Sequence, residues 1–302
     1  MLKISVAMTT CNGEKYIKEQ LNSVLNQLRR PDEVIITDDV SDDGTVEIIR
    51  SFIEEHRLTD WKLIINEERL GFKQNFKKAI SLTSGDIIFL CDQDDVWFED
   101  KIESLLSLFT KNDRLLAVSS AFTVIDGNGA VSDSGHTGNN HGLICTKVKR
   151  LLQRIDLKTV MRCNISPGCT SAYRRQVAEK YLEITDGTLP HDYELNLIAA
   201  AENGLYFYNA PLIKYRIHGG NTLGLSGKEQ TRLEIAEEKL AAAETVYKAT
   251  GDGHLCRLCE KRLDILKNRR TAAAVTLIFS PSYRKYYTLR EWAGDILYTK
   301  EV

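Results

Sequence analysis

The first hundred residues alternate short apolar runs with amphipathic helical patterns, and this alternation limits the fold more than any other feature. Strand-like runs, short and apolar with β-branched side chains, occupy residues 3–9, 32–39, 61–65 and 86–92. Between them, apolar residues recur at helical spacing over 13–27, 43–56 and 72–85. Strands that alternate with helices over short connections imply a mostly parallel sheet with helices on both faces. We therefore predict an α/β fold.

The remainder of the chain is less regular. Residues 117–131 predict a strand pair around a turn at 126–129, and residues 165–177 predict a helix entered from a Pro-Gly pair. A second helix is expected over 189–204, followed by a strand-like run over 206–222. Beyond Gly224 the pattern is helical throughout.

Composition excludes few functions but shows a charge asymmetry. The 302 residues carry a net charge of −2, which gives no sign of nucleic-acid binding. Residues 254–300 hold ten Lys/Arg and four Asp/Glu, a net +6, which leaves −8 for the rest. Seven scattered cysteines, a strand-like N-terminus and the lack of a long apolar run predict reduced thiols and a cytosolic location.

Two of the expected strands end directly in acidic runs, at Asp38-Asp39 and at residues 92–95. Because the carboxyl ends of parallel strands meet at one edge of a sheet, where α/β proteins bind ligands, we expect both runs on one rim. Five carboxylates there would repel one another unless a cation or a polar ligand neutralises them. Helix capping, for example by Asp42, is the alternative for one cluster alone. Two clusters on one rim favour a binding site.

The chain lacks both glycine-rich fingerprints that hold phosphates at a helix start, G-x-G-x-x-G after the first strand and G-x-x-x-x-G-K-[ST]. A diphosphate on an acidic rim would instead be held by a divalent metal that bridges carboxylate and phosphate. Asp92 and Asp94 offer oxygen ligands suited to Mg²⁺ or Mn²⁺. Asp39 could accept a hydrogen bond from a nucleobase imide N–H. The chemistry implied is the departure of a nucleoside diphosphate.

Six segments follow one another over about residues 3–222: ISVAMTTCNGEKYIKEQLNSVLNQ, DEVIITDDVSDDGT, LGFKQNFKKAI, GDIIFLCDQDDVW, GCTSAYRR and PHDYELNLIAAAENGLYFYNAPLIKYRIHGGNT. In this order and spacing they resemble glycosyltransferase family 2, whose members have the GT-A nucleotide-sugar-binding fold. Any one segment is weak evidence, whereas six in register are strong. The forms DQDDVW and HGGNT look most like bacterial transferases that build surface polysaccharides, rhamnosyltransferases among them.

The resemblance implies a nucleotide site at five positions of this sequence. Thr9 and Cys11 would line the base and the ribose, and Asp39 would bind a uracil or thymine ring. Asp92 and Gln93 would lie near the ribose and the diphosphate. An Asp that faces the imide edge suits uracil and thymine, so the expected donor is a UDP- or dTDP-sugar.

The resemblance also implies the reaction. Asp94 would bind Mn²⁺ or Mg²⁺, and His218 would complete the metal or diphosphate site. Asp192 would be the catalytic base, taking a proton from the acceptor hydroxyl in a single displacement with inversion. The family usually has Gly or Asn at the position of Val40 and Thr at that of Asp42, so these departures leave the details of base recognition open.

The protein expected from these features is a metal-dependent inverting glycosyltransferase. Its acceptor would be a saccharide, expected from the family to be lipid-linked and at the inner face of the cytoplasmic membrane, in cell-surface polysaccharide (O-antigen or capsule) synthesis. We place the GT-A domain at 1–222, with a nucleotide-binding half at 1–114 and an acceptor-binding half at 115–222. Residues 223–302 form a helical C-terminal extension.

Other functions fit part of the pattern. Residues 92–96 match the D-x-D-x-[TV] motif of aspartyl-phosphate phosphatases, with Asp92 as nucleophile. That chemistry places the motif on the first strand, whereas here it ends the fourth. A non-catalytic nucleotide-sugar-binding module of the same fold would have no need of all three residues assigned to metal binding and proton transfer. Structural roles are the remaining alternatives, namely a helix cap for Asp192 and a turn for His218.

Three further segments carry separate expectations. Residues 132–142, rich in Gly, Asn and Ser, are expected to order over the donor as a lid. Cys256-x-x-Cys259 has metal or redox spacing but no second pair, and its apolar helical neighbours favour core packing. Residues 280–298 interleave aromatic with basic side chains, which suits either an anionic membrane surface or a helical dimer contact.

Overall fold

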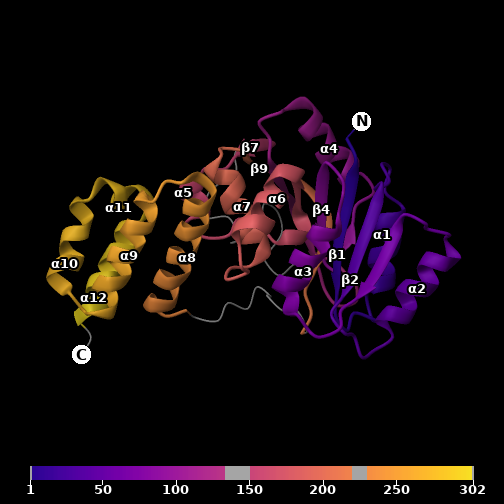
Figure 1. Ribbon diagram of the computed structural model, residues 1–302, viewed down its shortest axis with the longest axis horizontal. Helices are drawn as coiled ribbons and strands as arrows, with labels where there is room; N and C mark the ends of the chain where they lie inside the picture. Colours follow the sequence, from indigo (N-terminus) through magenta and orange to yellow (C-terminus); the bar gives the residue numbers. More distant parts are fainter. Residues whose placement is uncertain (1, 133–149, 220–229, 301–302) are drawn as a thin grey trace.

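The computed structural model describes residues 2–132, 150–219 and 230–300 (Figure 1). Within these ranges, nine strands form one sheet: β1 (Ile4–Thr10), β2 (Glu33–Asp38), β3 (Trp61–Ile65), β4 (Ile87–Cys91), β5 (Val96–Trp97), β6 (Ala117–Ile125), β7 (Leu152–Arg154), β8 (Ser171–Arg174) and β9 (Leu205–Arg216). The helices that accompany the sheet are α1 (Ile17–Leu25), α2 (Thr45–Glu55), α3 (Gly71–Leu82), α4 (Lys101–Lys111), α5 (Leu157–Val160), η1 (Gly168–Thr170), α6 (Arg175–Ile184) and α7 (His191–Ala201). The C-terminal helices are α8 (Arg232–Thr250), α9 (His254–Lys267), α10 (Thr271–Thr276), η2 (Leu277–Phe279), α11 (Pro281–Tyr286) and α12 (Leu289–Lys300).

The sheet has the order β3-β2-β1-β4-β8-β6-β9-β5, and β7 also pairs with β9. The first four strands in this order are mutually parallel, as the β-α-β pattern predicts. Next to them, β8 pairs antiparallel with both β4 and β6, and β6 is parallel to β9. The mixed sheet with helices on both faces confirms the predicted α/β fold class.

Alternation along the central strands explains the two layers of helices. Successive side chains of a strand point to opposite faces of the sheet. Val6 and Met8 belong to an apolar cluster that contains α1, α2 and α4, whereas Ala7 belongs to a second cluster that contains α3, α6 and α7. Every residue of β1 and of β4 is buried, as in strands that are covered on both faces.

Three local expectations need correction. The helix expected directly after the Pro-Gly pair at 167–168 is wrong, because η1 and then β8 precede α6, and a four-residue strand is too short for its period to be recognised. The turn at 126–129 forms, but among the described residues its return strand is only a bridge between Ile125 and Val131. Helix α1 covers only Ile17–Leu25 of the expected 13–27, and Leu28 beyond it is 65% exposed.

A helical C-terminal region, α8 to α12, extends from one side of the sheet along the long axis of the molecule (Figure 1). The second apolar cluster continues from α7 into α8 and α9, so the extension packs against the domain. The proposed division at 222/223 lies outside the described residues. So does the expected lid at 132–142, apart from Ser132. Within the ranges given above, no helix is both long and apolar enough to cross a membrane.

The cysteines follow the sequence prediction in part. Free thiols occur at Cys11, Cys91, Cys169, Cys256 and Cys259. The last two are buried in the second apolar cluster, in agreement with a packing role for the C-x-x-C segment. The sixth described cysteine, at position 163, is disulfide-bonded. Reduced thiols throughout were therefore a wrong expectation, because an odd total does not prevent one pair from forming.

Candidate active site

The loops that follow β1, β2 and β4 are tied together at one rim of the sheet. Gln93 Oε1 accepts a hydrogen bond from the Cys11 backbone N–H at 2.8 Å, and its Nε2 donates to the Cys11 carbonyl at 2.9 Å. A Cβ at Gly13 would clash with the Gln93 side chain, so this clasp requires glycine there. Asp38, fully buried, accepts from the Thr10 hydroxyl at 2.6 Å. The strand ends therefore meet as the parallel topology requires, with Thr9 nearly buried in β1.

Asp39 holds the start of α3. Its Oδ1 accepts from the Leu70 N–H at 2.7 Å and from Asn66 Nδ2 at 2.8 Å, and its Oδ2 accepts from the Gly71 N–H at 2.8 Å. A carboxylate has about four acceptor positions. Three of those of Asp39 are used inside the protein, and one position on Oδ2 remains for a ligand.

Val40 adopts a backbone conformation that explains the family pattern at this position. Its φ is 58°, in the left-handed region that favours Gly or Asn. A β-branched side chain there strains the backbone by about 1–2 kcal/mol. The departure from Gly or Asn therefore changes the side chain and leaves the turn next to Asp39 in place.

Asp94 and His218 meet although 124 positions separate them in the chain. Asp94 Oδ2 lies 2.9 Å from His218 Nε2, and both side chains are partly accessible, at 16% and 19%. The first lies in the loop between β4 and β5, and the second follows β9. The Tyr16 ring lies 4.8 Å from the imidazole, centroid to centroid, and forms a wall beside the pair.

Arg216, the last residue of β9, holds the loop that carries Asp94 and Asp95. Its backbone N–H donates to Asp95 Oδ1 at 2.9 Å, and its Nε donates to the Asp94 carbonyl at 2.7 Å. The guanidinium is buried and also forms an ion pair with Glu19 at 2.5 Å. Sequence reasoning missed this residue, although it lies within the segment YRIHGGNT that contains His218.

Asp92, Asp95 and Cys169 form a second, deeper cluster whose ligand atoms lie within 4.8 Å of one another. Loss of water and the charge of Asp94 raise the pKa of Asp92 to about 7, and the same two causes hold the pKa of Asp95 well above its usual range. Burial also raises the pKa of the Cys169 thiol, so it stays protonated and is a poor metal ligand. The excess of carboxylates over local cations fits a divalent cation on this rim.

Lys101 is the buried cation beneath the acidic cluster. Its Nζ donates to the Cys169 carbonyl at 2.5 Å and lies 3.7 Å from the centroid of the Trp97 ring. Burial lowers the pKa of Lys101 to about 8. No sequence signal marked this residue, because a lysine in the first turn of a helix ordinarily faces solvent.

Asp192 lies in the first turn of α7, with its Oδ1 accepting from the Tyr193 backbone N–H at 2.8 Å. Burial raises the pKa of Asp192 to about 6. A Cβ at Gly168 would lie 3.3 Å from the Asp192 Cβ, so η1 passes close to this helix start. The charge of Asp192 also contributes to the raised pKa of Asp92, which indicates that the two lie in one site.

His191 is buried beside Asp192 without a hydrogen-bond partner for either ring nitrogen among the described residues. Its ring stacks on Phe76, with 3.9 Å between centroids and 21° between planes. Burial lowers the pKa of His191 to about 3, so it is neutral at physiological pH. From the sequence alone, His191 is expected only to lie near the start of a helix.

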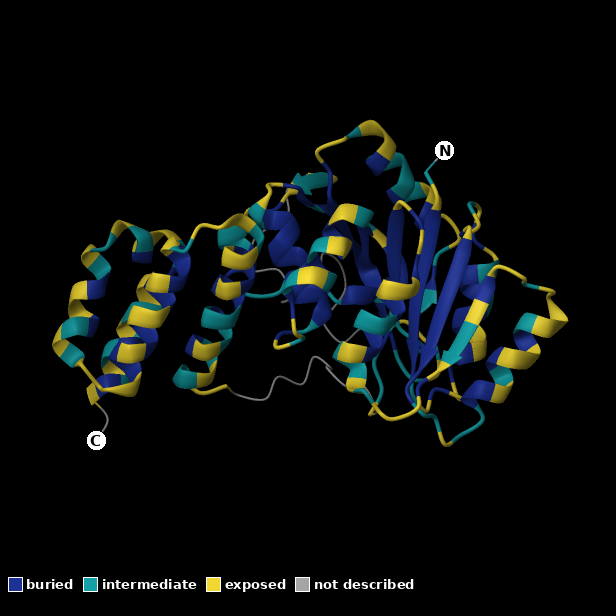
Figure 2. Ribbon diagram, in the orientation of Figure 1, coloured by how far each residue is buried: buried dark blue, intermediate teal, exposed yellow. Residues whose placement is uncertain are grey.

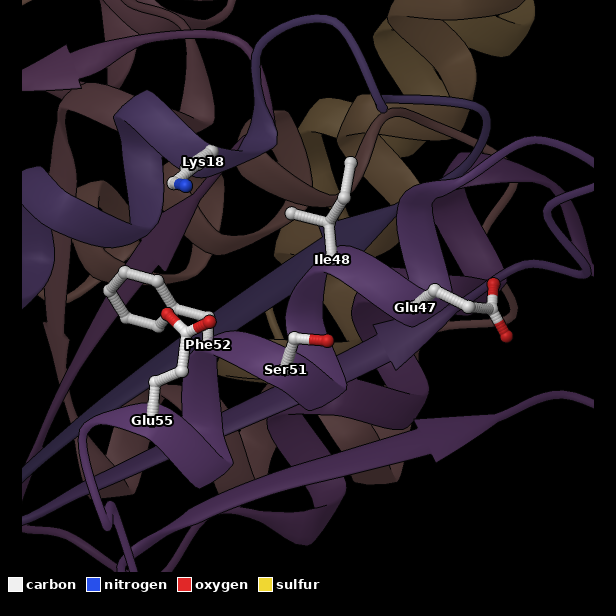
Figure 3. A pocket seen from close by; sticks show the side chains of 6 residues that line it. All are labelled: Lys18, Glu47, Ile48, Ser51, Phe52 and Glu55. Atoms are coloured by element: carbon white, nitrogen blue, oxygen red, sulfur yellow. The ribbon is translucent and has the colours of Figure 1, made fainter.

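An open hollow between α1 and α2, of about 230 Å³, contains none of the expected site residues (Figure 3). Its walls mix apolar, polar and charged side chains of both signs: Lys18, Glu47, Ile48, Ser51, Phe52 and Glu55. Figure 3 shows Glu47 pointing away from Lys18. The acidic rim, and not this hollow, is therefore the candidate active site.

Two solved structures share this fold. TarS 1-349 of S. aureus, in complex with UDP-GlcNAc, matches with a TM-score of 0.62 and 18% identity, over 97% of this chain and 79% of that one. The mannosyltransferase PcManGT of Pyrobaculum calidifontis, in complex with GDP-Man and Mn²⁺, matches with a TM-score of 0.54 and 18% identity, over 99% and 88%. At this identity the likeness concerns the fold, which is the GT-A fold.

Sequence comparison gives the family. The model "Glycosyl transferase family 2" matches residues 5–182, more than half of the chain, so the protein belongs to glycosyltransferase family 2. An uncharacterized glycosyltransferase of Nostoc sp. is 28% identical over 229 residues, 73% of this chain and 66% of that protein. The dTDP-rhamnosyl transferase RfbG of Shigella flexneri is 27% identical over 236 residues, 72% and 73%. The chain thus spans about two thirds to three quarters of these relatives.

Proposed function

We propose that this glycosyltransferase moves a sugar, with inversion, from a UDP- or dTDP-sugar to a saccharide acceptor in bacterial cell-surface polysaccharide synthesis, and that it depends on a divalent metal. The observation that carries the proposal is the contact between Asp94 and His218, 2.9 Å apart, beside carboxylates that continue to Asp192. Membership of the family makes the aspartyl-phosphate phosphatase alternative wrong.

In this proposal, Asp94 and His218 hold Mn²⁺ or Mg²⁺. An oxygen and an imidazole nitrogen at the accessible edge of an acidic cluster suit these ions, and the protonated thiol below does not compete. When bound, the metal would neutralise charge on the leaving diphosphate. Arg216 keeps the Asp94 peptide in position through its bond to the Asp94 carbonyl.

The nucleotide would lie across the clasp between the strand ends, with Thr9, Cys11 and Gln93 beneath it and Asp92 near its diphosphate. Asp39 has one acceptor position left, and uracil and thymine each present one imide N–H. Guanine presents two neighbouring donors, of which this carboxylate could accept only one well. The geometry thus supports a UDP- or dTDP-linked donor, in keeping with the name of RfbG.

Asp192 would act as the general base. With its pKa raised to about 6, it is ionised at neutral pH yet more basic than an ordinary aspartate, which favours proton transfer from the acceptor hydroxyl. Contacts from the Tyr193 N–H, the Asn164 side chain and the Gly168 backbone hold this carboxylate in position at the start of α7. The acceptor would be a lipid-linked saccharide at the inner face of the cytoplasmic membrane, with the enzyme in the cytoplasm.

Thermal stabilisation by UDP, dTDP and GDP, each with and without Mn²⁺, tests this function. We expect UDP or dTDP with metal to stabilise the protein by about 2.7 kcal/mol at a hundredfold excess over the dissociation constant. Asp94→Ala should lose the effect, whereas Asp113→Ala, a fully exposed aspartate away from the rim, should keep it. Stabilisation without metal, or by GDP alone, would contradict the proposal. Binding without turnover of any UDP- or dTDP-sugar would favour the non-catalytic module.

A further inference from the structure

Helix α12 carries apolar side chains on two sides: Trp292 and Ile296 pack against the second apolar cluster, whereas other apolar residues face outward. Its buried residues are Asp295 and Thr299. By contrast, Leu289 is 70% exposed and Leu297 is 61% exposed. These two leucines and the exposed Ala293 recur every four residues, so they form one stripe on the outer surface. A surface helix ordinarily has polar residues on its outer face, so an outward apolar stripe is unusual.

The neighbouring α10–η2 segment carries a second stripe of the same kind. Ala272, Val275 and Phe279 are exposed at helical spacing. Phe279, at 76%, is the most exposed large apolar side chain in the described part of the chain, and Leu289 is the next. Two stripes of this kind are a contiguous apolar surface only if the helices lie side by side.

Hydrogen bonds show that α10 and α12 are antiparallel neighbours. The Thr271 hydroxyl donates to the Thr299 carbonyl at 3.3 Å, and Trp292 Nε1 donates to the Ala274 carbonyl at 3.1 Å. This register brings the end of the first stripe beside the beginning of the second. We call the six residues the apolar face: Ala272, Val275, Phe279, Leu289, Ala293 and Leu297.

The stretch of chain that carries the apolar face exposes basic side chains and no acidic ones. From 268 to 300 the exposed residues include no acid and six bases: Arg269, Arg270, Arg284, Lys285, Arg290 and Lys300. Both acids of this stretch are paired: the partly buried Glu291 with Lys239 at 2.5 Å, and the buried Asp295 with Arg262 at 2.8 Å. One acid from outside residues 268–300, Asp264 of α9, pairs with a member of this basic set, Arg270, at 2.9 Å.

We propose that the apolar face and its basic border bind an anionic lipid surface. Phe279 and the leucines would enter the boundary between headgroups and acyl chains, while the arginines and lysines meet lipid phosphates, which is how interfacial helices bind. A second copy of the chain fits this face less well, because a symmetric contact would set one basic border against another.

The position of the face is compatible with catalysis. It lies at the end of the long axis away from the sheet, so a membrane bound there leaves the acidic rim uncovered (Figures 1 and 2). The inference goes beyond the proposed function and does not depend on the identity of the donor.

Co-sedimentation of the full chain with vesicles tests the inference. We expect binding to phosphatidylcholine vesicles that contain phosphatidylglycerol, little binding to pure phosphatidylcholine, and loss of binding at high salt. Replacing Arg284, Lys285 and Arg290 by Gln should weaken binding about a hundredfold, since each basic residue near such a surface contributes ~1 kcal/mol, or about fivefold. Phe279→Ser with Leu289→Ser should weaken it at least about tenfold.

Leu28→Ser is the matched control, because Leu28 is 65% exposed but lies beyond α1, outside the extension. It should bind vesicles like the wild type, and all variants should keep the wild-type unfolding midpoint and nucleotide binding. Failure of the wild type to bind anionic vesicles at low salt would overturn the inference, as would equal binding by all variants. A concentration-dependent dimer that the Phe279/Leu289 variant abolishes, without vesicle binding, would assign the face to a second copy instead.

Discussion

The acidic rim and the helical extension both concentrate charge, but they neutralise it in opposite ways. At the rim, Asp92, Asp94 and Asp95 lie together with two buried basic side chains, Lys101 and Arg216, of which Arg216 is also paired with Glu19. In residues 268–300 of the extension no acid is exposed, since Asp295 is buried in a bidentate contact with Arg262 and Glu291 pairs with Lys239, and the remaining bases face solvent. The first arrangement leaves negative charge unbalanced inside a site, and the second leaves positive charge unbalanced on a surface.

This difference separates charge used for ligand binding from charge used for folding. A carboxylate whose pKa is raised by burial and by like charges is destabilised in its ionised form until a ligand neutralises it. A buried ion pair with two hydrogen bonds is already neutralised and depends on no ligand, although removal of one partner is costly. Substitutions in the two regions should therefore affect different observables.

The largest effect is expected for Asp192→Asn at the rim. Loss of the general base should lower kcat by about two to four orders of magnitude, while the dissociation constant of the nucleotide changes little. Glu202→Gln, at the exposed far end of the same helix, is the control and should retain full activity. Comparable losses in both variants would indicate that damage to α7, and not loss of the base, is responsible.

The pH–rate profile of the wild type examines the same residue without mutation. The base must be ionised, and burial raises the pKa of Asp192 to about 6. The rate should therefore fall about tenfold per pH unit below pH 6 and level off above it. A rate that stays constant down to pH 5 would rule out a rate-limiting role for this carboxylate at its raised pKa.

In the extension, Arg262→Met should lower the free energy of unfolding by about 3–5 kcal/mol, because Asp295 would be left charged and buried. Denaturant unfolding measures this loss. The double variant Arg262→Met with Asp295→Leu should recover most of it, since no unpaired charge remains. Arg290→Met, on the exposed side of α12, should change stability by less than about 0.5 kcal/mol. A small loss in the Arg262 variant would mean that Arg232, 3.8 Å from Asp295, replaces the missing partner.

Much of the fold could be predicted because, in the first hundred residues, the local hydrophobic pattern agrees with the strands and helices that form. The strand over 61–65 has the predicted bounds, and the parallel order of β1, β2 and β4 follows from the β-α-β pattern. The strand β8 could not be predicted, because its four residues are fixed by pairing with β4 and β6 and not by a local pattern. Short central strands depend on partners that are distant in the chain.

The candidate site likewise contains some residues that could be predicted from the sequence and some that could not. The residues that we propose to carry the reactive or ligating groups lie at strand ends and helix starts. Asp39 and Asp94 could be named from these positions, and His218 from the family resemblance. Residues that hold them, such as Arg216 and Lys101, are ordinary basic residues until the fold buries them. The function of Arg216 depends on atoms from the loop between β4 and β5, more than a hundred positions away.

Burial of His191 beside the rim should make the free energy of unfolding depend on pH. Its pKa is about 3 in the folded protein and about 6.5 in an unfolded chain, so only the unfolded state gains a proton between these values. Stability should therefore fall below pH 6.5, by about 2 kcal/mol at pH 5. His191→Phe should remove this dependence, and comparing each protein with itself at pH 7.5 and pH 5 cancels the packing change. An unchanged difference would contradict a neutral buried imidazole.

The smallest effect concerns the strained turn beside Asp39. Val40→Asn should raise the free energy of unfolding by about 1 kcal/mol, because Asn tolerates the left-handed conformation that Val40 adopts at φ 58°. Asn203, at φ 59° after α7, provides the reverse control, and Asn203→Val should lose a similar amount. Denaturant midpoints measure both. If Val40→Asn proved destabilising while Asn203→Val behaved as expected, contacts of the half-buried valine side chain would outweigh its strain, and this departure from the family pattern would be a gain in packing.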